Sequence, residues 1–144
     1  MVRSRRAHPD TRVGHRARRC RALPQRPSGG SIRLVSKGTA IEETIGTPAD
    51  NETSLYTHQG ASVLLTHFCA LTPGGHIARL ALQPRHGTQP LEFVFVGASN
   101  LSGPNAAHMR RVLISFTDRD HFREQWTRSE NGKDTIFDLH FVRR

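Results

Sequence analysis

A histidine and a cysteine, His67 and Cys69, lie two positions apart in a mostly apolar part of the sequence. Alternate residues of a β-strand project from the same face, so a strand here would place an imidazole beside a thiol. With His108 and Glu124 from elsewhere in the chain, these groups have the chemistry of a zinc site, and His67 or His108 could ligate haem. A structural role in the core is the favoured interpretation, because cysteine outside disulfides commonly packs as a small apolar residue.

The other reactive residues do not form a catalytic constellation. A thiolate at Cys69 activated by His67 needs a third group to orient the imidazole, and the sequence shows none. Glu42 and Glu43 are adjacent, so on a strand they point to opposite faces, cannot share a proton, and are expected to lie in solvent at a sheet edge. The sequence therefore predicts no catalytic residues and no enzymatic activity, and it identifies no cofactor.

A different set of residues is suited to binding a small, largely apolar molecule. Aromatic side chains would line the interior of a small barrel, and a few polar groups would orient the guest. The residues predicted to line this site are Phe93, Phe95, Arg110, Glu124, Trp126 and Phe137. The alternative is a packed core closed at one end by an ion pair of Arg110 and Glu124, since small barrels often fill their interior with side chains.

These residues lie in segments whose pattern has period two, the spacing of β-strands. Turn-forming residues interrupt the pattern every 8 to 12 residues, which is typical of sandwiches and barrels. Nine strands are expected, at residues 32–37, 39–45, 52–58, 62–69, 76–83, 91–97, 108–116, 121–129 and 134–142. Residues 98–107 are expected to form one short helical insertion. The predicted fold class is all-β, an antiparallel meander that closes into a barrel and so removes its edges.

The dipeptide Asn131-Gly132 sets the register of the last two strands. Both residues tolerate positive φ, as a type I′ hairpin turn requires, and this turn places Trp126 opposite Phe137. The same register pairs Glu130 with Lys133, Arg128 with Thr135, Glu124 with Leu139, and Phe122 with Phe141.

A second hairpin turn is predicted at Gln59-Gly60. It would pair Tyr56 with Val63 on the two flanking strands. Strands joined by such short turns lie next to each other and run antiparallel.

The order of several short motifs resembles that of a known group of proteins. The segment 56–69 ends in Leu-Thr-His-Phe-Cys, and it precedes Leu91-Glu92-Phe93-Val94-Phe95, Ala98-Ser99-Asn100-Leu101, His108-Met109 and Glu124-Gln125-Trp126-Thr127. In this order the motifs resemble small, uncharacterised bacterial proteins with a lipocalin-like, calycin-type barrel, over roughly residues 38–143. The resemblance implies a barrel fold and no particular activity, because none is established for the group.

The positive charge of the chain is concentrated in its first thirty residues. The net charge is +9, yet residues 1–30 contain nine arginines and one acidic residue, and the remainder contains 12 basic and 11 acidic residues. With few apolar residues to bury, this tail is predicted to be disordered, followed by a barrel domain at 31–144. Nucleic-acid binding through the tail is a third functional alternative and is not favoured, because the tail has no aromatic residue to stack on bases.

Composition excludes several other classes of protein. The longest mostly apolar stretch, 61–71, is far shorter than the roughly 20 residues of a membrane helix, so no membrane span is expected. The chain's two cysteines, Cys20 and Cys69, are too few for a disulfide framework. The tail lacks the apolar run of a secretory signal, so the protein is expected in the cytoplasm. The sequence does not predict an oligomeric state.

Overall fold

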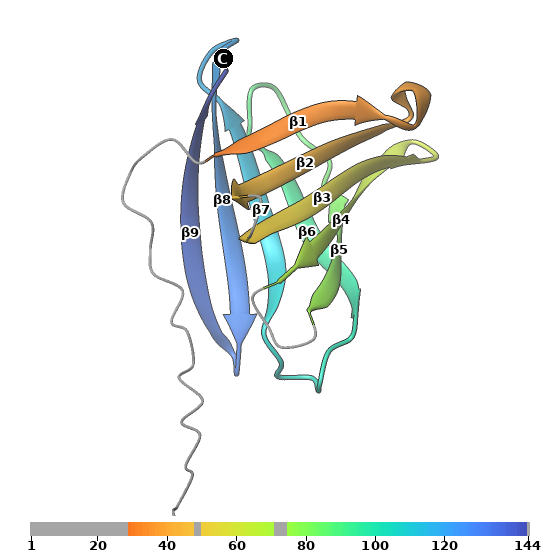
Figure 1. Cartoon of the computed structure of the whole chain (residues 1–144), viewed down its shortest axis with the longest axis vertical. Coiled ribbons are helices and arrows are strands. Elements are labelled where there is room, and N and C mark those ends of the chain that lie inside the picture. Colours follow the sequence, from red (N-terminus) through yellow and green to blue (C-terminus); the bar gives the residue numbers. More distant parts are fainter. Residues whose placement is uncertain (1–28, 48–49, 71–74, 144) are drawn as a thin grey trace, which may run out of the picture.

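The fold is one antiparallel β-sheet whose strands follow each other in sequence order and curl into a half-barrel (Figure 1). The computed structural model describes residues 29–47, 50–70 and 75–143. Its strands are β1 (Gly30–Val35), β2 (Ala40–Thr47), β3 (Asp50–Gln59), β4 (Ser62–Cys69), β5 (His76–Leu82), β6 (Leu91–Ser99), β7 (His108–Phe116), β8 (His121–Glu130) and β9 (Lys133–Val142). A 3₁₀ turn, η1 (Ser36–Gly38), connects β1 to β2.

The prediction of an all-β antiparallel meander is confirmed. Each of the nine strands begins and ends within about two residues of its predicted place. Every neighbouring pair is antiparallel, from β1 with β2 to β8 with β9. Antiparallel pairing allows this order because a short turn is enough to join two adjacent strands.

The predicted helical insertion at 98–107 is wrong. Ala98 and Ser99 continue β6 and pair with Ala78 and Ile77 of β5, so the sheet ladder uses the backbone groups that a helix would need. From Asn100 to β7 the chain forms turns and bends. Among the described residues, η1 is the single helical element, and none of them forms a helix long and apolar enough to cross a membrane.

The two predicted hairpin turns have different outcomes. Asn131 and Gly132 have φ of 51° and 72°, and all the predicted pairs between β8 and β9 are confirmed. The register predicted from Gln59-Gly60 is wrong, because the turn lies one residue later and Tyr56 pairs with Leu65. Gly60, with φ of 60°, takes the first position of this turn, where a glycine accepts positive φ without strain.

A β-bulge moves Arg110 out of the barrel interior. The register of β7 against β8 shifts between Met109 and Arg111, so one extra residue stands in β7. Met109 and Val112 then both face the core, and Arg110 points to the surface, where its Nη1 lies 3.2 Å from Asp134 Oδ2. The predicted ion pair of Arg110 with Glu124 is therefore not formed.

The core lies on the concave face of the sheet. Its buried members are Leu65, Cys69, Ala78, Leu80, Phe93, Met109, Val112, Ile114 and Trp126. The edge strands β1 and β9 are not paired with each other in the described part of the chain, so hydrogen bonds do not close the sheet. Strand β1 begins beside the upper part of β8 and β9 (Figure 1), and a Cβ at Gly30 would lie 3.5 Å from the Phe141 ring. Because the barrel is open here, Ile32 of β1 is 54% exposed.

Candidate functional site

Buried polar side chains gather on the concave face, where a barrel core is usually apolar. They are Glu43, Ser54, His67, His76 and Glu124. Cross-strand pairing brings several of them together, because Glu43 of β2 lies opposite Ser54 of β3, and Ser54 lies opposite His67 of β4. Residues that pair in this way share one face of the sheet. Two groups result, a pair of carboxyl groups and a cluster of histidine, cysteine and glutamate.

The first group is a carboxyl pair formed by Glu43 of β2 and Glu124 of β8. Each residue is only 1% exposed, and the two side chains hydrogen-bond to each other. The hydroxyl of Tyr56 donates to Glu43 Oε2 at 2.8 Å, and the indole N–H of Trp126 donates to Glu124 Oε2 at 2.8 Å. A tyrosine and a tryptophan thus fix the two carboxyl groups from opposite sides of the barrel.

Burial determines the protonation of this pair. It raises the pKa of Glu124 to about 9, with a further contribution from the charge of Glu43. Burial also raises the pKa of Glu43, opposed by the hydrogen bonds from Glu124 and Tyr56. At neutral pH Glu124 therefore keeps its proton, since two carboxylates this close do not both ionise.

The expectation that Glu43 lies in solvent is wrong. The two faces were correctly assigned, since Glu42 points outward and pairs with Arg33 through Nε at 2.8 Å. Glu43 points inward, and its partner is Glu124, which is distant in sequence. The sequence does indicate the inward position of Glu43, because Ile41, Glu43 and Ile45 alternate with polar residues and so share one face.

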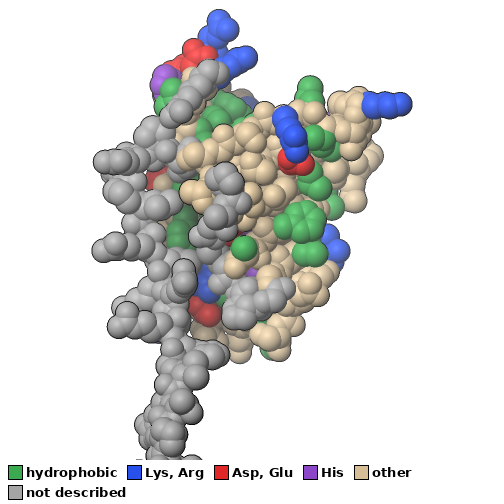
Figure 2. Space-filling view, in the orientation of Figure 1, with side chains coloured by type: hydrophobic (Ala, Val, Ile, Leu, Met, Phe, Trp, Pro, Cys, Tyr) green, Lys and Arg blue, Asp and Glu red, His purple; other side chains and the backbone are tan. Residues whose placement is uncertain are grey.

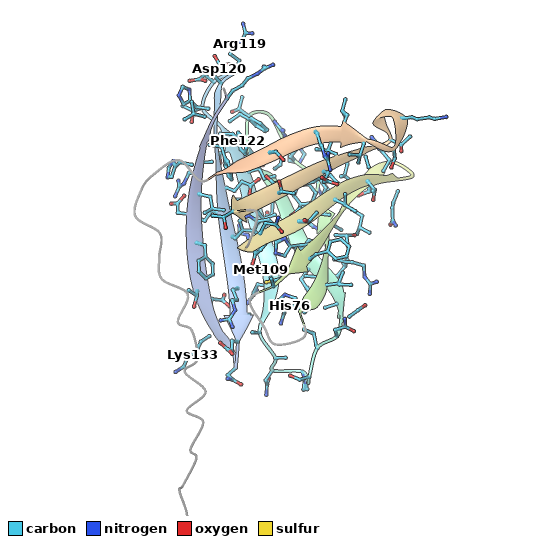
Figure 3. All side chains as sticks on the ribbon, in the orientation of Figure 1. His76, Met109, Arg119, Asp120, Phe122 and Lys133 are labelled. Atoms are coloured by element: carbon cyan, nitrogen blue, oxygen red, sulfur yellow. The ribbon has the colours of Figure 1, made fainter. Side chains whose placement is uncertain are left out.

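A cavity of about 860 Å³ opens beside Glu43, at the end of the half-barrel where β1 approaches β9. Aromatic rings of Phe116, Phe122 and Phe141 contribute to its walls, and Phe122 and Phe141 stack with ring centroids 4.5 Å apart. Figure 3 shows Phe122 on β8 below the charged loop of Arg119 and Asp120, which also borders the cavity. In Figure 2 acidic and basic side chains gather at this upper end of the molecule. The cavity therefore has apolar walls, a buried acid and a charged rim.

The residues predicted to bind a ligand lie away from the two cavities found among the described residues. Phe93 and Trp126 are packed in the core at 2% and 3% exposure, and Phe95 packs on His108 with centroids 4.6 Å apart. Phe137 is half-buried opposite Trp126 on β9. None of the six predicted residues, Phe93, Phe95, Arg110, Glu124, Trp126 and Phe137, lines the cavity beside Glu43 or the one described below.

The second group of polar residues contains Glu52, His67 and Cys69. The Cys69 thiol donates to Glu52 Oε1 at 3.3 Å, and His67 Nε2 faces Glu52 Oε2 at 3.5 Å. The other ring nitrogen, Nδ1, lies 3.0 Å from Ser54 Oγ, and the imidazole packs on Trp126 with centroids 4.5 Å apart. All three ligand atoms lie within 4.8 Å of one another, a separation that one metal ion can bridge.

The structure brings together only part of the predicted metal set. His67 and Cys69 are adjacent on β4, as predicted from their spacing. His108 lies outside the group, because its Nδ1 is 2.8 Å from the Ala106 carbonyl oxygen and its ring packs on Phe95. Glu124 belongs to the carboxyl pair. Glu52, which the sequence interpretation missed, takes the third place.

Ionisation at this group differs from that of the carboxyl pair. Burial opposes the ionisation of Glu52, yet the facing His67 and Cys69 side chains lower its pKa below the ordinary value. Burial, together with nearby His67, lowers the pKa of His76 on β5. An ionised carboxylate is the form of glutamate that binds metal ions.

The basic tail and its suggested nucleic-acid binding lie outside the described residues, except for Gly29 and Gly30. Comparisons of the chain with protein-family models, with curated proteins and with solved structures find no match in any of the three. The candidate sites therefore rest on the geometry of this chain alone.

Proposed function

We propose that this protein binds a small, largely apolar molecule non-covalently in the cavity beside Glu43, as a lipocalin-like barrel without catalytic activity. The observation that carries the proposal is the cavity of about 860 Å³ with phenylalanine walls and one buried acid. Ligand sites commonly combine such apolar walls with a few placed polar groups. Glu43 is engaged by Tyr56 and by Glu124, which favours recognition over proton transfer.

The chemistry of the walls specifies the kind of guest. Phe116, Phe122 and Phe141 offer ring faces and edges, which favour an aromatic or planar apolar body. Glu43 contributes carboxyl oxygens, which accept hydrogen bonds, so it favours a guest with a hydrogen-bond donor. The proposed ligand is accordingly an apolar molecule with one donor group.

The test is uptake of the neutral, environment-sensitive dye Nile red by the full chain. Ile32, a cavity residue at 54% exposure, is replaced by tryptophan to narrow the cavity without disturbing the core. Val96, at 58% exposure on β6 and away from both cavities, receives the same replacement as a matched control.

The wild type and Val96→Trp are expected to bind Nile red at a single site, and Ile32→Trp is expected to weaken binding at least about tenfold, or ~1.4 kcal/mol. Equal binding by Ile32→Trp and Val96→Trp would place the dye elsewhere and reject the proposal. Uptake that appears only after addition of urea would reject it as well, because the dye would then report unfolded chain.

A further inference from the structure

The cluster of Glu52, His67 and Cys69 has the composition and spacing of a metal site. The three side chains come from two adjacent strands and share the concave face: Thr53 pairs with Phe68, which puts Glu52 and Cys69 at the next register position. Thiolate, imidazole and carboxylate are the three ligand types that zinc accepts in proteins. Calcium and magnesium prefer oxygen ligands alone, so this set selects a borderline-soft cation.

The ligand atoms lie near the separations that a tetrahedral zinc site requires, all within 4.8 Å of one another. With metal–ligand distances of about 2.0–2.3 Å, the edges of such a tetrahedron are about 3.3–3.8 Å long. The Cys69 sulfur lies 3.3 Å from Glu52 Oε1, and His67 Nε2 lies 3.5 Å from Glu52 Oε2. The two distances end on different oxygens of the Glu52 carboxylate, so the thiol and the imidazole both face this one carboxylate at the spacing of metal ligands.

His67 is held in the orientation that metal binding needs. Ser54 Oγ lies 3.0 Å from Nδ1, so Nδ1–H can donate to the serine when Nε2, which faces Glu52, binds a cation. Nε2 is buried and makes no hydrogen bond of ordinary geometry. Histidines that bind metals usually donate their second ring nitrogen to such an outer partner. Packing on Trp126 further restricts the ring.

The cluster lies beside a second cavity. This cavity, of about 580 Å³, is lined by Cys69 together with His76 and Asn51 at the far end of the half-barrel. Figure 3 shows His76 at the lower end of the molecule, away from Phe122 and the first cavity. Cys69 is the member of the cluster that borders this cavity, so the cavity is the side from which a cation would approach.

We infer that Glu52, His67 and Cys69 bind a zinc ion, whose fourth position is taken by water from the second cavity. On binding, the Cys69 thiol loses its proton to solvent and the sulfur forms the metal bond, so the metal replaces the proton that Cys69 shares with Glu52. This site is separate from the proposed ligand cavity and does not depend on it.

Cobalt(II) titration of the full chain tests the assignment, because cobalt takes the place of zinc and absorbs visible light. A single equivalent is expected to give the intense visible bands of tetrahedral cobalt and a thiolate-to-cobalt charge-transfer band in the near ultraviolet, and zinc is expected to abolish both. Cys69→Ser must remove the charge-transfer band. The matched variant Cys20→Ser, which removes the chain's other cysteine, must retain it.

Cys69→Ser could lose the charge-transfer band because it fails to fold, so two further variants keep Cys69. Glu52→Gln is nearly isosteric and is expected to weaken zinc binding more than about tenfold, and Ser54→Ala, which removes the outer partner of His67, about 10–100-fold. His58→Gln, an exposed histidine on the same strand, is the control and should bind zinc as the wild type does. Charge transfer that survives in Cys69→Ser, or zinc affinity unchanged in Glu52→Gln, would overturn the assignment.

Discussion

The glutamates at the two ends of the concave face, Glu124 at one end and Glu52 at the other, have pKa values shifted in opposite directions. At the upper end burial and mutual repulsion raise the pKa of Glu124 to about 9, so the carboxyl pair retains a proton. At the lower end Glu52, although largely buried, has a lowered pKa because an imidazole and a thiol face it. The side chains that face a glutamate from neighbouring strands, and not burial alone, therefore determine whether it is protonated or ionised.

This difference in ionisation favours a different kind of ligand at each end of the concave face. A retained proton and aromatic walls at the upper end favour an organic molecule, whereas an anionic carboxylate beside sulfur and nitrogen at the lower end favours a cation. Trp126 separates them, because its N–H donates to Glu124 and its ring packs on His67. This one side chain therefore contacts both groups of polar residues.

The largest effect is expected from Trp126→Ala. Removing the ring deletes core packing, leaves Glu124 without its indole donor and frees the His67 imidazole, so the free energy of unfolding should fall by about 3–5 kcal/mol. Urea denaturation measures this loss. It is followed by circular dichroism, because the variant lacks the chain's single tryptophan and so cannot be followed by tryptophan fluorescence. Trp126→Phe keeps an aromatic ring and should cost less. A cost below about 1 kcal/mol for Trp126→Ala would show that the two ends are independent of it.

The next effect is the pH dependence of stability at the upper end. Folded Glu124 keeps its proton up to a pKa of about 9, whereas the unfolded chain loses it near 4.5. The folded state therefore binds more protons between these values, and the free energy of unfolding falls as pH rises, by at most ~1.4 kcal/mol per pH unit. From roughly pH 5.5 to pH 8 the loss is about 3 kcal/mol.

Glu124→Gln cannot ionise and is expected to flatten this decline, measured as denaturation midpoints across the same pH range. Glu42→Gln is the matched control, because Glu42 lies on the outer face and pairs with Arg33. It should keep the slope of the wild type. If Glu124→Gln also kept that slope, the retained proton would lie elsewhere and the contrast with Glu52 would fail.

Much of this fold follows from local pattern, since period two predicts every strand and Asn131-Gly132 predicts the last register. The register of the β3–β4 hairpin and the bulge at Arg110 did not follow. A bulge reverses the alternation after one residue, and no residue type in β7 marks where this happens. Arg110 was consequently placed inside, although the sheet turns it toward Asp134.

The candidate sites were predictable only within single strands. His67 and Cys69 are two apart on β4, so their proximity follows from strand geometry alone. Glu52 reaches them through the pairing of β3 with β4, and Glu43 meets Glu124 through the curl of the whole sheet. Such contacts depend on register and curvature, which alternation in one sequence does not specify.

The smallest effect is expected where charges lie outside the barrel. Arg123 and Asp138 pair across β8 and β9, with Arg123 Nε 2.6 Å from Asp138 Oδ1, and both side chains remain more than a third exposed. The hydrogen bond from Arg123 lowers the pKa of Asp138, but solvent screens the attraction, so Arg123→Ala should cost about 0.5 kcal/mol. Denaturation at low and at high salt measures this, and salt should reduce the difference from wild type. A loss as large as that caused by raising the pH around Glu124 would contradict the expectation that charges on the outer face contribute less to stability than the buried carboxyl groups.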